Sequence, residues 1–346
     1  MIVGGSFIST GDEASTFARF HFRPHFLQHS GFRLVASDDE APATHLFAGN
    51  FDGQAAAAAA AAKQDDDGAA GGNTNSNGNV YETDDSLHMY LGLHYPTSGE
   101  EEGVPPILPH ANAPNHGLYF PQRVARLLNT LNPEPTNNRA LDIGCAVGGA
   151  SFELAKTFEH VDAFDFSESF VRAAKHMQER DDVTFRVPIE AEIYREVRAV
   201  HGEGVTNEVR SNVNFFAGDA QMIGEMNAEG KLGTYDGVVM SNLLCRLPDP
   251  SACINALPCI VNKGGVVVMV TPFSWLLEFT PKSKWLGGFD DPVSKDPIYS
   301  KDVQKEMMES RGFEKIHEEE MPLVIREHQR KYQYIVSEAT GWRKKE

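Results

Sequence analysis

Residues 140–149, ALDIGCAVGG, carry one acid and three glycines directly after a short apolar run. The spacing of Asp142, Gly144, Ala146 and Gly148 is typical of a turn that joins a strand to a helix. Small residues at positions 144 and 146 allow a ligand to contact the backbone, which a larger side chain would block. The backbone amides that begin the helix then face a polar group of that ligand. The turn therefore predicts a nucleotide-binding site.

Two further acids indicate which nucleotide fits this turn. Asp165 ends the next apolar run, 23 residues after Asp142, where its carboxylate can accept hydrogen bonds from both ribose hydroxyls. An NAD site would share these features. However, an acid before the first glycine suits a positively charged group, and Asp219 in AGDA (217–220) can bind an adenine amino group. S-adenosylmethionine has an ammonium and a sulfonium but no phosphate, so it is favoured over NAD.

The elements that must position these residues alternate between helices and strands. Between helical stretches, the sequence predicts apolar strands at 139–143, 160–165, 213–217, 235–241 and 266–271. Such alternation indicates an α/β fold with a doubly wound, seven-stranded, mainly parallel sheet. The last two strands, 313–321 and 331–339, have no helix between them. They should form an antiparallel C-terminal hairpin in place of a second mononucleotide-binding half. Residues 183–212 receive no assignment.

The composition divides the chain near residue 80. Residues 1–79 hold an alanine run (55–62) and the string GGNTNSNGN (71–79), which have no apolar stripe to bury. Such a segment cannot offset the entropy of ordering, so a disordered low-complexity leader is expected. The folded domain is expected over residues 80–346, and it begins with two cap helices at 81–95 and 120–131.

Charge and composition exclude several classes of protein. A formal net charge of -18 argues against binding to nucleic acid. No apolar run approaches the roughly 20 residues that span a bilayer, so a soluble, cytoplasmic protein is expected. The alternative is organellar import, because residues 16–33 hold three arginines and no acid, although Asp12 and Glu13 precede them. The four cysteines form no C-x-x-C pair, so no metal site is expected.

Several longer strings make residues 80–346 similar to one family. They resemble the C-terminal methyltransferase domain of ovothiol synthases, within the class I S-adenosylmethionine-dependent methyltransferases. The strings are YETD (81–84), FPQR (120–123), ALDIGCAVGGASFELA (140–155), FDFSESFV (164–171), SNLLCRLPDP (241–250), TPFSWLLEFTP (271–281), WLGGF (285–289) and IREHQRKYQYIVSEATGWR (325–343). The glycine turn is shared by the whole class, whereas the C-terminal string is far more distinctive.

The resemblance implies methyl transfer to an imidazole nitrogen of 5-thiohistidine (4-mercaptohistidine), the last step to ovothiol A. Which of the two ring nitrogens is methylated stays open. In the family, a sulfoxide-synthase region commonly precedes this domain, and nothing here resembles it. A separate sulfoxide synthase and C–S lyase are therefore expected to supply the substrate.

The resemblance also implies a set of cofactor residues. The turn meets the methionine part, Asp165 holds the ribose, Asp219 binds adenine, Asn242 borders the sulfonium, and Arg123 is a partner for the methionine carboxylate. Ala146 replaces a glycine of the class, a change from one small residue to another. The predicted cofactor residues are Asp142, Gly144, Ala146, Gly148, Asp165, Phe166, Ser167, Asp219, Ala220, Asn242 and Arg123.

The substrate that accepts the methyl group must be positioned accurately, and this matters more than acid–base chemistry. Methyl transfer from a sulfonium is an in-line displacement, and a neutral imidazole nitrogen already carries a lone pair. An amino-acid carboxylate calls for an arginine, and its ammonium for a carboxylate or an aromatic face. No certain catalytic residue is assigned, and Tyr81 and Asn242 are positioning candidates. The substrate-binding candidates are Tyr81, Glu82, Tyr95, Trp275, Arg326, His328, Arg330 and Glu338.

Each substrate candidate also has a structural interpretation. Arg330 and Glu338 could pair across two strands, Tyr95 and His94 could be core residues, and Trp275 could anchor its loop. Two rival functions remain: a methyltransferase for another small thiol, selenol or imidazole acceptor, and a non-catalytic cofactor-binding protein of the same fold.

Overall fold

The computed structural model describes residues 2, 3, 19, 20, 80–97, 106–132 and 138–345. The chain divides into two compact units, Met1–Gly71 and Gly72–Glu346. In the first unit, β1 (Ile2–Val3) pairs antiparallel with β2 (Arg19–Phe20). The rest of the predicted leader, residues 1–79, lies outside the described residues.

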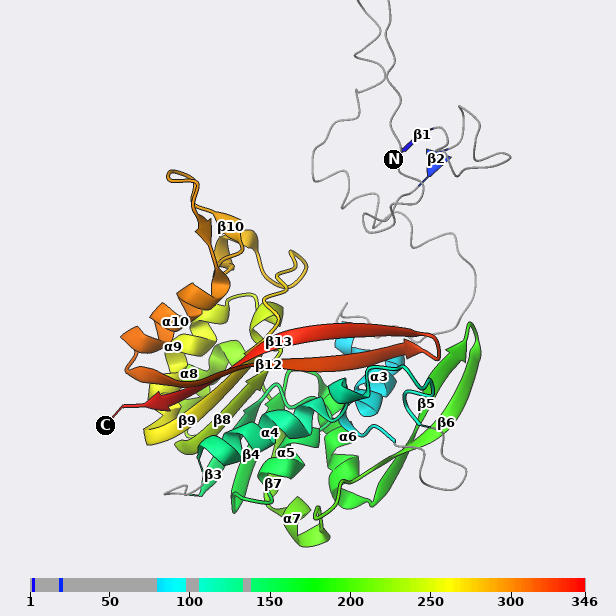
Figure 1. Cartoon of the computed structure of the whole chain (residues 1–346). Helices are drawn as coiled ribbons and strands as arrows, with labels where there is room; N and C mark the ends of the chain where they lie inside the picture. The colour runs from blue at the N-terminus through cyan, green and yellow to red at the C-terminus, as the bar shows by residue number, and fades with distance from the viewer. Residues whose placement is uncertain (1, 4–18, 21–79, 98–105, 133–137, 346) are drawn as a thin grey trace, which may run out of the picture. The chain divides into compact units, whose positions relative to one another are not determined.

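The second unit is built on a seven-stranded sheet with the order β12-β13-β9-β8-β3-β4-β7 (Figure 1). Its central strands pair in parallel, and β13 runs antiparallel to both of its neighbours. The prediction of a doubly wound, mainly parallel sheet with an antiparallel C-terminal hairpin is confirmed. The strands are β3 (Arg139–Ile143), β4 (His160–Asp165), β7 (Val213–Ala217), β8 (Tyr235–Ser241), β9 (Val261–Thr271), β12 (Phe313–His328) and β13 (Lys331–Lys344).

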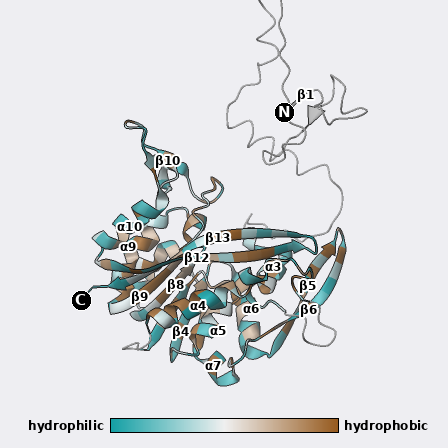
Figure 2. Cartoon of the chain, viewed as in Figure 1, coloured by the Kyte–Doolittle hydropathy of each residue, from teal (hydrophilic) through white to brown (hydrophobic). Residues whose placement is uncertain are grey.

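Helices cover both faces of the sheet because its central strands are apolar on both sides (Figure 2). In β9, Val266, Val268 and Val270 belong to one hydrophobic core, whereas Val267 and Met269 belong to the other. This alternation follows from the two-residue period of a strand. The first core includes α4 (Phe120–Leu131), α5 (Gly149–Leu154) and α6 (Glu168–Glu179), and the second includes α8 (Ile223–Ala228), α9 (Pro250–Ile260) and α10 (Ser300–Ser310).

The predicted helix at 81–95 is interrupted near its start. A short 3-10 helix, η3 (Val80–Glu82), is followed by α3 (Asp84–His94). The side chain of Thr83 accepts a hydrogen bond from the backbone N–H of Ser86 and so caps α3. A threonine in extended conformation before a helix suits this role.

The unassigned region 183–212 is mainly a β-hairpin outside the sheet. It consists of β5 (Asp182–Glu190) and β6 (Ile193–Val200), followed by α7 (Asn207–Ser211). Most of β6 is exposed, so the apolar–polar alternation that marks a strand is weak. The hairpin packs against α3 and β12.

The C-terminal hairpin is much longer than predicted. Glu338 of β13 pairs with Thr271, the last residue of β9. Because β13 runs antiparallel to β9, residues 331–337 continue past the carboxyl end of the sheet. Beyond the sheet, β12 packs against α3 and β5 (Figure 1). The remaining described elements are η4 (Asn115–Gly117), η5 (Ala220–Met222), η6 (Leu244–Arg246), η7 (Lys282–Lys284), β10 (Phe289–Asp290) and β11 (Pro297–Ile298).

Candidate active site

The glycine turn after β3 has the backbone conformation that its small residues permit. Gly144, Ala146 and Gly148 all have positive φ, at 78°, 46° and 87°. A β-carbon at Gly148 would lie 2.8 Å from the Phe215 ring, so both the conformation and the space require glycine there. Ala146 adopts the left-handed conformation despite its β-carbon, which costs about 1 kcal/mol relative to glycine.

Asp165 links this turn to the end of β4. One carboxylate oxygen accepts a hydrogen bond from the backbone N–H of Ala146 at 2.9 Å, and the other accepts from Ser167, also at 2.9 Å. Each oxygen of a carboxylate has two acceptor sites, so both retain capacity for a further donor. The side chain is therefore fixed at the carboxyl ends of two adjacent parallel strands, where open α/β sheets bind ligands.

Two carboxyl groups, one buried and one partly buried, give this edge of the sheet its electrostatic character. Asp142 is 2% exposed and accepts a hydrogen bond from Ser151 Oγ at 2.6 Å. Burial, and secondarily the charge of Asp165, raises the pKa of Asp142 to about 7. Burial also raises the pKa of Asp165, although hydrogen bonds from Ser167 and Ala146 oppose this. A positively charged ligand would favour the ionised form of both carboxyl groups and so offset the cost of their burial.

The carboxyl group of Asp142 lies in the protein interior. It lies beneath the turn, almost fully buried, and bonds to the helix that follows. Its influence at the turn is therefore electrostatic.

The adenosine-side candidates lie after β4 and β7. Phe166 is 66% exposed, an unusual state for a large apolar ring. Ser167 caps α6 by accepting from the N–H of Phe170 at 3.1 Å. Asp219 caps η5 by accepting from the N–H of Gln221, and Ala220 is buried. The capping role does not use the second carboxylate oxygen of Asp219.

Asn242 lies at the carboxyl end of β8 in a left-handed conformation, with φ of 51°. Its backbone N–H donates to the carbonyl of Val270, and its side-chain oxygen accepts from Ser337 Oγ at 2.9 Å. The C-terminal hairpin is therefore tied to the loop after β8.

The N-terminal cap brings Tyr81 and Glu82 to the same place. The carbonyl of Tyr81 accepts a hydrogen bond from Ser167 Oγ at 3.1 Å. The charge of Glu82 contributes to the raised pKa of Asp165, after burial, so the two carboxylates are neighbours. These two candidates thus lie beside the predicted ribose site.

Three other substrate candidates, Arg326, His328 and Arg330, lie away from this edge, whereas Glu338 lies at it, paired with Thr271. Arg326 donates to the carbonyls of Ile107 and Pro188, which clamps β12 onto the cap and β5. His328 and Arg330 are at the hairpin tip, roughly 25 Å along β13 from Glu338 at about 3.3 Å per residue. Glu338 faces Glu320 across the hairpin, so the suggested cross-strand pair of Arg330 with Glu338 is wrong.

Three further candidates have structural partners. Tyr95 is 4% exposed, and its hydroxyl donates to the carbonyl of Val147 at 2.7 Å. The indole of Trp275 is buried and donates to Ser300 Oγ at 2.8 Å. The guanidinium of Arg123 donates to the carbonyls of Leu118 and Pro322, joining α4 to β12.

Sequence reasoning missed two residues at this edge. Arg246 and Phe279 belong to the loops after β8 and β9, and the Arg246 Cζ lies 4.9 Å from the centroid of the Phe279 ring. The Tyr81 ring stacks against Phe279 with centroids 6.1 Å apart. Arg246, Phe279 and Tyr81 all lie in strings that resemble the ovothiol synthase domain, and this was the sequence signal that could have identified them.

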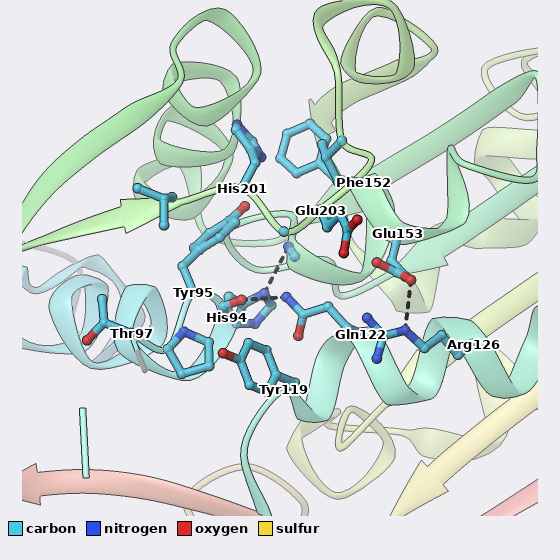
Figure 3. A pocket seen from close by; sticks show the side chains of 15 residues that line it. His94, Tyr95, Thr97, Tyr119, Gln122, Arg126, Phe152, Glu153, His201 and Glu203 are labelled. Atoms are coloured by element: carbon cyan, nitrogen blue, oxygen red, sulfur yellow. Dashed lines mark hydrogen bonds and ion pairs between the residues drawn. The ribbon is translucent and has the colours of Figure 1, made fainter. Parts of the chain in front are cut away.

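A cavity of about 250 Å³ lies behind the turn, where α3, α4 and α5 meet (Figure 3). There, His94 Nδ1 accepts a hydrogen bond from the backbone N–H of Gly149 at 3.0 Å, and Gln122 donates to the His94 carbonyl. Arg126 forms an ion pair with Glu153 at 2.8 Å. His94 thus caps the helix that follows the glycine turn, a contact between segments 55 residues apart.

His94→Leu is expected to destabilise the fold by about 1–3 kcal/mol, because the Gly149 N–H loses its buried acceptor. Burial lowers the pKa of His94 to about 3, so the folded protein holds this ring neutral. The unfolded chain binds a proton below pH 6.5, so stability falls on acidification from there toward pH 3, by at most about 1.4 kcal/mol per pH unit. The variant should lose this component of the slope.

Urea unfolding at pH 7.5 and pH 5.5 measures both effects. His176→Leu, at an exposed position of α6, is the matched control and should change neither. Equal pH slopes for the wild type and His94→Leu would contradict the assignment.

The described residues contain neither a metal-binding cluster nor a membrane-spanning helix. In that part of the chain, no three His, Cys, Asp or Glu side chains are grouped to hold a metal ion. Likewise, none of the described helices is long and apolar enough to cross a membrane.

The sequence of residues 116–318 matches the model of a methyltransferase domain family. This chain therefore belongs to that family, the class I S-adenosylmethionine-dependent methyltransferase domains. The buried Asp142 and the partly buried Asp165 beside the glycine turn fit this cofactor, which carries positive charges on its amino and sulfonium groups. A comparison with curated proteins finds no match.

Solved structures with a similar fold have low sequence identity. The N-terminal domain of EvdMO1 with bound SAH is 15% identical, covers 75% of this chain and 95% of its own, and has a TM-score of 0.42. Magnesium protoporphyrin IX methyltransferase from Synechocystis PCC 6803 with bound SAH is 18% identical, with coverages of 65% and 83% and a TM-score of 0.37. These TM-scores are below 0.5, so the fold assignment rests on the strand order of this chain.

Proposed function

We propose that the protein transfers the methyl group of S-adenosylmethionine to an imidazole nitrogen of 5-thiohistidine. The observation that carries the methyl-transfer part is the position of Asp165 and the glycine turn at the carboxyl ends of β4 and β3. The similarity of residues 80–346 to the ovothiol synthase domain supports the acceptor. Enzymes that form and then cleave a C–S bond on histidine would supply it.

The residues of the turn would hold the cofactor through its charged ends. When bound, S-adenosylmethionine supplies a methyl group on a sulfonium. The Asp165 carboxylate would accept from the ribose hydroxyls, and the buried Asp142 would favour the ammonium through its charge. Phe166 would gain a packing partner in the adenine, which accounts for its 66% exposure.

The acceptor chemistry requires orientation of a ring with three possible nucleophiles. The lone pair of one nitrogen must align with the methyl carbon and the sulfur, while the thiolate, a better nucleophile, points elsewhere. The positive charge that the ring gains is balanced by its own thiolate, so no strong base is required. Asn242 and Tyr81, at the edge of the site, are the proposed positioning residues.

Incubation of the full chain with S-adenosylmethionine and 5-thiohistidine should give a product heavier by one methyl group. Mass spectrometry detects the product, and NMR locates the new methyl on a ring nitrogen. Histidine should be a much poorer acceptor, because it lacks the thiolate that makes the ring electron-rich. If histidine were preferred, or if the methyl were on sulfur, this proposal would be wrong.

The same assay separates the two rivals. Turnover of another thiol, selenol or imidazole in place of 5-thiohistidine would indicate a different acceptor. Cofactor binding in calorimetry without any methylated product would indicate a binding-only protein.

A further inference from the structure

Arg246 lies at the edge of the site in a position set by two loops. It ends η6, which begins three residues after the end of β8. Its Nη1 donates to the carbonyl of Cys245 at 3.1 Å and to that of Ser274, in the loop after β9, at 3.2 Å. These bonds hold the guanidinium at the carboxyl end of the sheet.

One aromatic ring faces this guanidinium, and the Tyr81 phenol lies beside it. Phe279 lies 4.9 Å from its Cζ, within the range of a cation–π contact. The Tyr81 ring is nearly parallel to Phe279, at an interplanar angle of 29°. Burial raises the pKa of the Tyr81 phenol, and the neighbouring charge of Arg246 together with a hydrogen bond partly offsets that rise. The arginine therefore lies against the cap as well as the two loops.

Within the described part of the chain, Arg246 forms no ion pair with a carboxylate, although the protein has 49 acidic residues. Its hydrogen bonds go to two backbone carbonyls, to Cys245 Sγ and to the Tyr81 phenol, none of which is a carboxylate. A planar guanidinium on an aromatic face suits a carboxylate, which it can bind through two parallel N–H groups.

The cofactor and an amino-acid acceptor each carry an α-carboxylate, and the position of Arg246 favours the carboxylate of the acceptor. The predicted ribose and adenine residues follow β4 and β7, whereas Arg246 follows β8, on the other side of the glycine turn. We propose that Arg246 binds the α-carboxylate of an amino-acid acceptor and so fixes the position of its ring. This inference rests on the proposed function, since it deepens the assignment of the acceptor.

The test is acceptor binding to the protein preloaded with S-adenosylhomocysteine, measured by calorimetry. The ligands are 5-thiohistidine and its decarboxylated amine. The wild type should bind the amino acid about 30-fold more tightly than the amine, because a charged hydrogen-bonded pair is lost. Arg246→Gln should weaken amino-acid binding by about 30-fold, leave binding of the amine unchanged and so remove the preference. Arg246→Lys should recover part of it.

Matched controls separate this role from general damage. Arg311→Gln removes a guanidinium that bonds to the Asn255 side chain on the surface of α9, and it should change nothing. The affinity of Arg246→Gln for S-adenosylhomocysteine should stay within twofold of the wild type. If cofactor binding weakened instead, Arg246 would hold the cofactor's carboxylate, and the inference would be overturned. An unchanged affinity for the amino acid would also overturn it.

These outcomes are distinguishable from failure of the proposed function. An acceptor that binds through Arg246 but gives no methylated product contradicts the function and supports the arginine's role. The wild type could instead form the methylated product while Arg246→Gln binds the acceptor as tightly as the wild type does. That result supports the function and contradicts the inference. Absence of any binding of 5-thiohistidine to the loaded wild type contradicts both.

Discussion

Asp165→Ala is expected to weaken binding of S-adenosylmethionine by about 100-fold or more. The carboxylate is fixed by the backbone amides of Ala146 and Ser167, and both of its oxygens keep an acceptor site for the ribose hydroxyls. A hydrogen bond to a charged acceptor contributes about 1.5–3 kcal/mol, so the loss of two exceeds a factor of 100. Calorimetric titration with S-adenosylhomocysteine measures the change without turnover.

Two further variants make this result specific. Asp182→Ala removes an exposed carboxylate that pairs with Arg198 on the β5–β6 hairpin, and it should leave cofactor affinity unchanged. Asp165→Asn keeps the shape but loses the charge and one of the two acceptors, so an intermediate loss is expected. A Kd for Asp165→Ala within threefold of the wild type would show that the ribose lies elsewhere.

Cofactor affinity should increase with pH from about 6 to about 7.5, because the cationic ligand selects the ionised form of Asp142. Burial raises the pKa of this carboxyl to about 7 in the free protein, so binding at pH 6 requires a proton to leave. The dependence approaches tenfold per pH unit below that pKa and flattens above it. The neighbouring Asp165 also has a raised pKa, so the two carboxyl groups titrate together and the released proton is not assigned to either one.

Calorimetry in buffers of different ionisation enthalpy measures the released proton directly. About one proton should be released per cofactor bound at pH 6 and close to none at pH 8. Asp142→Asn keeps an acceptor for Ser151 and should flatten the pH profile, with lower affinity above pH 7. A wild-type affinity that is constant from pH 6 to pH 8 would contradict the electrostatic role of Asp142.

The same pKa has a consequence for folding. The folded-state pKa of Asp142 lies above the value of about 3.9 in an unfolded chain, so the folded protein binds more protons between these values. The contribution of Asp142 to stability is therefore fully present below about pH 4 and is lost as the pH rises through 7. The pH dependence that Asp142 gives to stability is opposite in sign to that of His94. A bound cationic cofactor should remove the contribution of Asp142, because it stabilises the ionised carboxylate.

The parts of the fold that the sequence predicted well have local causes. The strand 235–241 has the predicted bounds because its apolar run is buried on both faces. Local chemistry also begins α9, where Asp249 accepts a hydrogen bond from the N–H of Ser251 and Pro250 occupies the first turn. The glycine turn can also be recognised locally, because the positive φ at residues 144, 146 and 148 suits small residues.

The parts that were missed depend on contacts between distant segments. The hairpin β5–β6 contains Pro188 and many exposed side chains, so neither strand has a clear period. The reach of the C-terminal hairpin depends on the pairing of Glu338 with Thr271, which composition does not indicate. That register carries His328 and Arg330 away from the sheet. The position of Arg246 likewise depends on rings contributed by two other segments.

A crystal structure of the full chain with S-adenosylhomocysteine tests the assignment of the cofactor site most directly. The ribose hydroxyls should lie about 3 Å from the Asp165 carboxylate, with the amino group above the turn at Gly144 and the adenine between Phe166 and Asp219. A ligand bound away from Asp165 and the turn, with Phe166 still exposed, would contradict the account.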